Sequence, residues 1–284
     1  MQPRQAAFAG SWYPGQAAAC EREIKSFLSH GENRPAAEQA WVGGIVPHAG
    51  WYYSGQIACN VIANLVSSNP PDVIVIFGMH LHPTSPAYIM SEGAWETPFG
   101  NLPIASSMAQ NLTQAFDFEI ETASRHHQDN TIELQLPFIK YFFKDVQIVP
   151  IGVPPTPSSL EIGRTVARLS AELNLTTRVI GSTDLTHYGV NYGFTPQGTS
   201  LSALDWVRNT NDRQVIEAML AMDPEAVIRE GLTHQNACCS GAVAAALAAA
   251  KQLGAEKALT DAYATSYDKS PGNSFVGYVA IVFS

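Results

Sequence analysis

Apolar positions along this chain follow two alternating patterns. Short continuous runs rich in β-branched residues predict buried strands, whereas apolar residues at helical spacing predict amphipathic helices. We predict strands at 41–46, 72–78, 87–93, 146–153, 177–184 and 273–284. We predict helices at 17–29, 54–67, 105–116, 131–143, 158–174, 200–208, 211–221, 223–230 and 240–254, with Pro137 as a kink or break in the fourth.

Strands that alternate with helices are typical of an α/β fold, whose mostly parallel sheet is covered by helices on both faces. The Pro-rich stretch 152–159 is the best candidate for a linker, but it lies within the alternation. We therefore interpret it as a loop and expect residues 1–284 to form a single domain.

Composition excludes several classes of function. The 284 residues are 46% apolar and 14% charged, and the net charge of −9 comes with no basic stripe, so we expect no nucleic-acid partner. No signal-peptide pattern and no apolar run of about 20 residues is present, so we expect a cytoplasmic protein with no membrane association. The cysteines, Cys20, Cys59, Cys238 and Cys239, do not form a disulfide framework.

Histidines follow three of the predicted strands. His48 comes after the first strand, His80 and His82 after the second, and His187 after the strand at 177–184. Ligands of open α/β sheets bind outside the carboxyl ends of the strands, so these residues are expected to converge. A single histidine there is more often structural, but three at equivalent positions favour a transition-metal site.

Other residues are candidates for a role in catalysis or binding, and each could instead have a purely structural role. Asp184 either orients a histidine or caps a helix. Cys238 and Cys239 precede a long helix, where a thiol has a lowered pKa and is a soft ligand for iron, copper or zinc; each is otherwise a small buried side chain. Glu133, on an apolar helix, is a ligand, an acid/base group or simply paired. Trp51, Tyr52 and Tyr53 either line a pocket or belong to the core.

Five motifs occur in the order found in the Memo family, which includes the AmmeMemoRadiSam system protein B group. They are FAGSWYPG at 8–15, VPHAGWYYSG at 46–55, TIELQLPF at 131–138, STDLTHYG at 182–189 and CCSGAV at 238–243. The resemblance covers nearly the whole chain. It implies an αβα sandwich with a mostly parallel or mixed sheet, similar to the class III, LigB-type extradiol dioxygenases.

The resemblance also implies a site. By position, His48 and Cys238 match two metal ligands of the family, and His80 matches a third better than His82 does. Asp184 and His187 match the acid/base motif. The chain departs from the family at Asn130, which replaces a histidine, and at Cys239, which replaces a glycine.

The function implied is a metal-dependent redox or oxygenase-like activity with iron or copper, or with zinc, on a small-molecule or peptide ligand. Ammecr-type and radical SAM proteins are the partners implied. A cysteine in place of the dioxygenase carboxylate argues against ring cleavage. Two alternatives stay open, namely a peptide- or protein-binding module that uses the same cleft and a metal-dependent hydrolase.

Overall fold

The computed structural model describes residues 2–29 and 41–284. The helices are α1 (Ala17–Ser29), α2 (Trp51–Asn64), α3 (Ser106–Ala115), α4 (Asn130–Glu133), α5 (Leu136–Phe142), α6 (Pro157–Glu172), α7 (Leu201–Trp206), α8 (Asp212–Leu220), α9 (Pro224–His234) and α10 (Ser240–Gln252). The strands are β1 (Gly43–Val46), β2 (Val73–Gly78), β3 (Ala87–Met90), β4 (Ala94–Trp95), β5 (Leu102–Pro103), β6 (Phe118–Glu121), β7 (Gln147–Gly152), β8 (Thr177–Ser182), β9 (His187–Gly189), β10 (Ala258–Thr265) and β11 (Ser274–Phe283).

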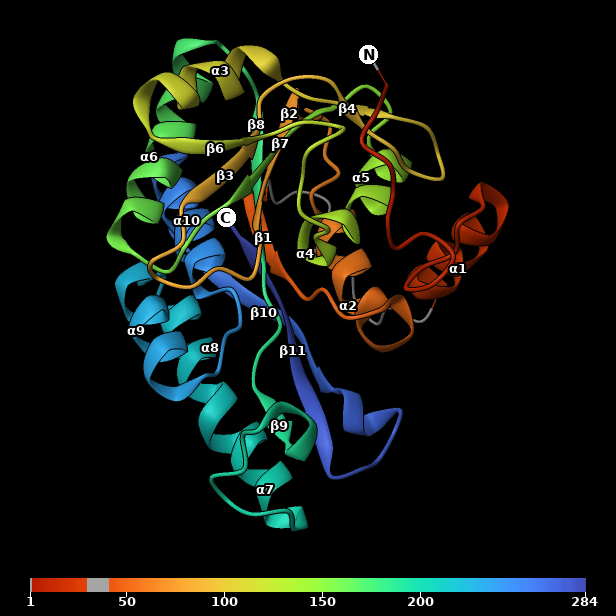
Figure 1. The fold of residues 1–284 in the computed structure, drawn as a ribbon, viewed down its shortest axis with the longest axis vertical. Helices are drawn as coiled ribbons and strands as arrows, with labels where there is room; N and C mark the ends of the chain where they lie inside the picture. The colour runs from red at the N-terminus through yellow and green to blue at the C-terminus, as the bar shows by residue number, and fades with distance from the viewer. Residues whose placement is uncertain (1, 30–40) are drawn as a thin grey trace.

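One mixed sheet organises the molecule, with strand order β10-β11-β1-β8-β2-β7-β3-β6 (Figure 1). Its centre is parallel, because β8 pairs in parallel with both β1 and β2, and β2 pairs in parallel with β7. Antiparallel pairs flank this centre, β1 with β11 on one side and β7 with β3 on the other. The expected α/β fold with a mixed central sheet is confirmed.

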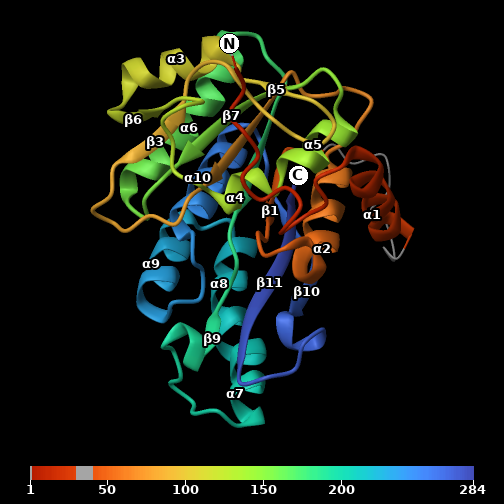
Figure 2. The ribbon, with the colours of Figure 1, turned by 45° about the vertical axis from the view of Figure 1, so that its right-hand side comes forward.

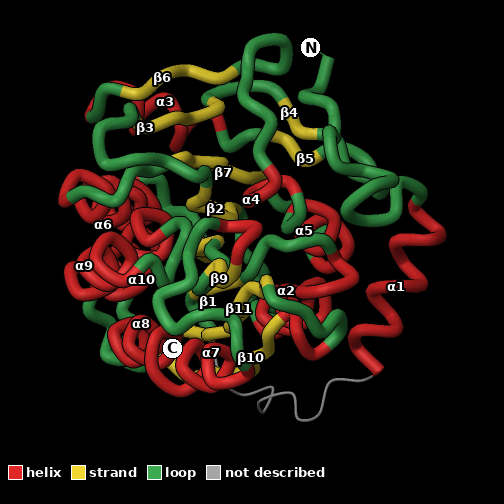
Figure 3. Tube along the Cα trace, turned by 60° about the horizontal axis from the view of Figure 1, so that its bottom comes forward, coloured by secondary structure: helices red, strands yellow, loops and turns green. Residues whose placement is uncertain are grey.

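Helices cover both faces of the sheet. Figures 1 and 2 show α6, α8, α9 and α10 on one side, and α1, α2, α4 and α5 on the other. The view along the sheet in Figure 3 separates the same groups, with the strands in a row between them. The result is the three-layered αβα sandwich that the alternating pattern predicted.

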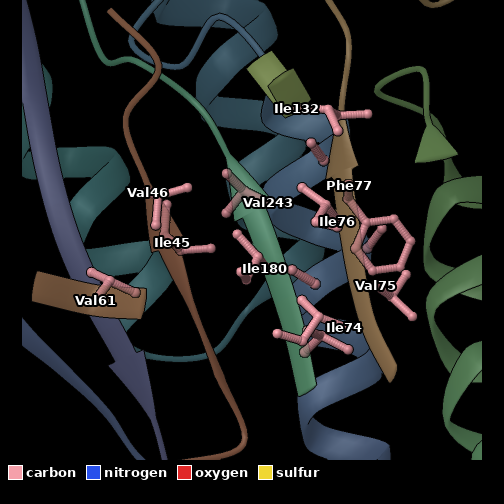
Figure 4. Packing of buried hydrophobic residues seen from close by; sticks show 14 of the residues in the cluster. Ile45, Val46, Val61, Ile74, Val75, Ile76, Phe77, Ile132, Ile180 and Val243 are labelled. Atoms are coloured by element: carbon pink, nitrogen blue, oxygen red, sulfur yellow. The ribbon is translucent and has the colours of Figure 1, made fainter. Parts of the chain in front are cut away.

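The core lies between the sheet and these helices. Ile45 of β1, Ile76 of β2 and Ile180 of β8 are fully buried side by side, and Val61 of α2 and Val243 of α10 pack onto them (Figure 4). Strands buried on both faces read as continuous apolar runs, which explains why the pattern located them correctly.

The hydrophobic pattern predicted two features of the fold less well. The predicted helix at 131–143 is divided into α4 and α5, with Pro137 in the first turn of α5, where its missing N–H costs nothing. We did not predict β10, whose outward side chains are polar or only half-buried, nor the short strands β4, β5, β6 and β9. No helix within the described residues is both long and apolar enough to cross a bilayer.

Candidate metal centre

Two histidines and two cysteines from distant parts of the sequence form one compact cluster. The Nε2 atoms of His48 and His80 lie 3.2 Å apart, and the Cys238 Sγ atom lies 3.3 Å from His48 Nε2. With Cys239 included, each residue offers one ligand atom, and these atoms all lie within 4.8 Å of one another.

The sheet explains this convergence. His48 follows β1 and His80 follows β2, and these strands run parallel on either side of β8. Cys238 precedes α10 and is fixed to the end of β8, because its backbone N–H donates to the carbonyl oxygen of Asp184 (3.1 Å). The carboxyl edge of the sheet thus gathers the side chains, as the sequence predicted.

His48 is held in one orientation. Its backbone N–H donates to Asp184 Oδ1 (2.7 Å), and its Nδ1 atom lies 3.0 Å from Ser182 Oγ. Since the Ser182 hydroxyl donates to the Thr131 carbonyl (2.7 Å), its oxygen accepts from His48 Nδ1–H. The Nε2 atom of His48 is therefore the one that faces His80 and Cys238.

The loop after β2 places His80. Met79 has a left-handed backbone (φ 69°), and its N–H donates to Thr131 Oγ1 (2.7 Å). A side chain at Gly78 would collide with Thr131, so glycine permits this approach of α4. His82 lies beyond this turn, exposed and within hydrogen-bond distance of Thr84 Oγ1, outside the cluster.

The two cysteine thiols differ in acidity. Burial alone would raise the pKa of the Cys238 thiol, but the Cys239 thiol and the nearby His48 and His80 hold that pKa well below its usual range. Cys238 Sγ also accepts the Asp184 N–H (3.3 Å). Burial and the charge of Cys238 raise the pKa of Cys239 well above its usual range. Cys238 is thus the better nucleophile and ligand of the two at neutral pH.

His48 and Asp184 form a buried pair of opposite charges. Burial opposes protonation of His48, but the charges of Asp184 and Cys238 outweigh it and raise the pKa of His48 to about 9. Burial also raises the pKa of Asp184, which His48 partly offsets. A cation bound by His48 Nε2 would take the place of the proton there.

A cavity of about 690 Å³ opens over His48 and His80. Asp184, His187, Asn130 and Tyr52 also line it. His187 Nδ1 donates to the Leu185 carbonyl (3.1 Å), so its Nε2 atom is the one left for a ligand. Asn130 Nδ2 donates to the His48 carbonyl (3.0 Å), so this residue supports the His48 backbone. No helix begins at Asp184, so the helix-cap alternative is wrong.

Two candidate residues lie away from the cavity. Trp51 is buried in the core, stacked on Phe138 with ring centroids 4.1 Å apart, so the pocket role expected for it is wrong. Glu133 accepts hydrogen bonds from the backbone N–H groups of Ala7 and Phe8 and from the Tyr13 hydroxyl. It holds the amino-terminal segment in place and does not reach the cavity.

Sequence reasoning missed three residues that shape the site. Ser182 and Thr131 position the histidines, and Trp12 lines the cavity. Ser182 is the first residue of the motif STDLTHYG, and Trp12 lies within FAGSWYPG, so both belong to motifs recognised in the sequence. The contacts that give these residues a role join segments far apart in sequence.

The donor set fits a transition metal. Two imidazole nitrogens and at least one acidic thiol are borderline-to-soft ligands, which suit copper, zinc or iron and not Mg²⁺ or Ca²⁺. His48, His80 and Cys238 are the residues that would hold the ion. The His48–Ser182 hydrogen bond is the kind of support that orients metal-binding histidines.

The chain is similar to known proteins in sequence and in fold. The family described as "Memo-like protein" matches residues 4–282. A MEMO1 family protein of Pyrococcus furiosus is 32% identical over 288 residues, 98% of each chain, and one of Methanosarcina barkeri is 34% identical over 286 residues, 98% of this chain and 99% of its own. An uncharacterized Escherichia coli K12 protein of known structure shares the fold, with a TM-score of 0.54 and 12% identity over 85% of this chain and 99% of its own. The chain therefore belongs to the Memo family.

Proposed function

We propose that this protein binds a redox-active transition metal, copper or iron, through His48, His80 and Cys238, and acts on a ligand in the adjoining cavity. The observation that carries the proposal is the 3.2–3.3 Å spacing of His48 Nε2 from His80 Nε2 and Cys238 Sγ, beneath a cavity of about 690 Å³. Buried polar groups, such as the side chains of His48 and Cys239 in this cluster, are costly unless they bind a ligand or are fully paired.

The side chains around the centre have distinct roles in this proposal. A bound copper or iron ion would supply one-electron chemistry. Asp184 fixes the His48 backbone and places negative charge beside the centre. His187, with its Nδ1 proton committed to Leu185, accepts or donates a proton at Nε2 toward a ligand in the cavity.

The test is metal titration of anaerobically purified protein with Cu⁺ and with Fe²⁺. We expect one equivalent to bind tightly to the wild type, and Cys238→Ser and His48→Ala to lose that binding. Cys20→Ser is the matched control, because Cys20 is a buried thiol hydrogen-bonded to the Pro14 carbonyl, remote from the centre. Full stoichiometric binding by His48→Ala would contradict the proposal.

A peptide-binding module is the second candidate, favoured by the aromatic rim of the cavity. Trp12, Tyr52 and Tyr192 line it and are 41%, 61% and 47% exposed. Exposed aromatic groups at a concave site are common where peptides bind. Peptides selected on the wild type that bind His48→Ala equally well but lose affinity for Tyr52→Ala would favour this module over the metal-dependent role.

A further inference from the structure

We propose that Cys239 is a metal ligand in this chain, so that the centre offers two imidazole nitrogens and two sulfurs to one cation. The inference rests on the proposed function, because it concerns the same centre. It adds a donor that the family resemblance does not assign, since the resemblance places a glycine at this position.

The backbone holds Cys239 in position. Its N–H donates to Thr183 Oγ1 (3.1 Å), and the Thr183 hydroxyl donates to the Asp184 carbonyl (2.8 Å). Cys238 is tied to the same loop through Asp184. Both cysteines are therefore fixed to the end of β8, and their sulfur atoms lie 3.7 Å apart.

The four donors differ in their access to the cavity. His48 and His80 line the cavity, whereas neither cysteine does, and Cys239 is 4% exposed. Neither cysteine therefore lies on the wall of the cavity, and Cys239 is the more buried of the two. Four donor atoms that all lie within 4.8 Å of one another are close enough to bind one small cation.

The second sulfur changes which cation the centre prefers. A set of two nitrogens and two sulfurs is typical of tetrahedral sites, and thiolates favour Zn²⁺ and Cu⁺ over Fe²⁺. A thiol binds a metal as the thiolate, so a cation bound at the centre would displace the Cys239 proton. We infer that, of the two ions proposed above, this chain prefers Cu⁺ to Fe²⁺ more strongly than a homologue with glycine at this position does.

Anaerobic Co²⁺ titration followed by absorption spectroscopy counts the sulfur ligands. Sulfur-to-cobalt charge-transfer absorption grows with the number of thiolates, and the visible bands of Co²⁺ report four-coordination. The proteins are wild type, Cys239→Ser, Cys239→Ala and the control Cys20→Ser. Competition with Zn²⁺ gives the relative affinity of each variant, and circular dichroism verifies that each is folded.

We expect Cys239→Ser and Cys239→Ala to lose about half of the charge-transfer absorption. Loss of a residue that hydrogen-bonds to a metal ligand typically lowers metal affinity by roughly 10- to 100-fold. Loss of a ligand itself should lower Zn²⁺ affinity by at least that much. Unchanged absorption and Zn²⁺ affinity in folded Cys239 variants would overturn the inference and leave the proposed function intact. Failure of the wild type to bind Co²⁺, Zn²⁺, Cu⁺ or Fe²⁺ would overturn both.

Discussion

The Nδ1 atom of His48 lies 3.0 Å from the hydroxyl oxygen of Ser182. Because that hydroxyl gives its own proton to the Thr131 carbonyl, Ser182 accepts from the imidazole and turns its second nitrogen toward His80 and Cys238. One buried serine therefore determines which nitrogen of His48 faces the cluster and would bind a metal.

Ser182→Ala should weaken metal binding without unfolding the protein. Loss of a group that hydrogen-bonds to a metal-binding histidine typically costs 10- to 100-fold in affinity, and we expect a decrease of about that size. Cu⁺ competition titration measures it. Ser170→Ala is the matched control, since Ser170 is also a buried hydroxyl that donates to a carbonyl, that of Leu175, away from the centre. Equal affinities of the two variants would contradict the role of Ser182.

The two histidines after β2 should behave differently. His80→Ala should abolish tight metal binding, because His80 Nε2 lies 3.2 Å from His48 Nε2. His82→Ala should leave affinity unchanged, because His82 interacts with Thr84 and Ser85 in an exposed turn. Isothermal titration calorimetry of both variants with the same metal distinguishes them. The reverse order of effects would assign the ligand to His82.

The neighbouring residues Trp51 and Tyr52 should contribute differently to stability, because Trp51 lies in the core and Tyr52 at the surface. Trp51 is buried and stacked on Phe138, so Trp51→Ala should lower the free energy of unfolding by about 3–5 kcal/mol. Tyr52 is 61% exposed, and Tyr52→Ala should change it by about 0.5 kcal/mol or less. Urea denaturation curves give both values. A small effect of Trp51→Ala would contradict its placement in the core.

Glu133 should prove structural and not catalytic. Its two oxygens accept from Ala7 N–H, Phe8 N–H and the Tyr13 hydroxyl, so Glu133→Gln places an amide group against one of these donors. We expect a loss of about 1–3 kcal/mol in the free energy of unfolding, with metal affinity preserved. Paired denaturation and titration experiments measure both, and loss of metal binding with normal stability would contradict this role.

Asp212 should make stability depend on pH. Burial raises the pKa of this carboxyl to about 6, against hydrogen bonds from Thr186 and Tyr263 and the charge of His187. A raised folded pKa stabilises the protonated form. Its contribution is therefore full below the unfolded pKa of about 4 and is lost as pH rises through about 6, a loss of about 3 kcal/mol by pH 7.

In the variant Asp212→Asn, residue 212 has no carboxyl group and therefore does not titrate. The free energy of unfolding of this variant, relative to wild type, should rise by about 3 kcal/mol between pH 4 and pH 7. Denaturation of both proteins across that range measures the difference. A difference that is constant with pH would show that Asp212 titrates normally.

The sequence by itself determined the layers and the edge at which the site lies. β1, β2 and β8 are buried on both faces, so each is a continuous apolar run, and the polar residue that follows each run marks the edge of the sheet. The sequence could therefore place His48 and Asp184 at one edge, together with His80 and His82 as alternatives. The position before the predicted helix at 240–254 made both Cys238 and Cys239 candidate ligands, and the family motifs favoured Cys238.

Only the tertiary structure decided which side chains face the centre. The left-handed turn at Met79 directs His80 to the cluster and leaves His82 outside, and Gly78 gives α4 the space to support that turn. Glu133 reads as a reactive carboxylate until the amino-terminal segment, more than 120 residues away in sequence, is seen to occupy both of its oxygens. Hydrophobic periodicity records which face of an element is buried, but the direction of a loop side chain depends on contacts between distant segments, which periodicity does not encode.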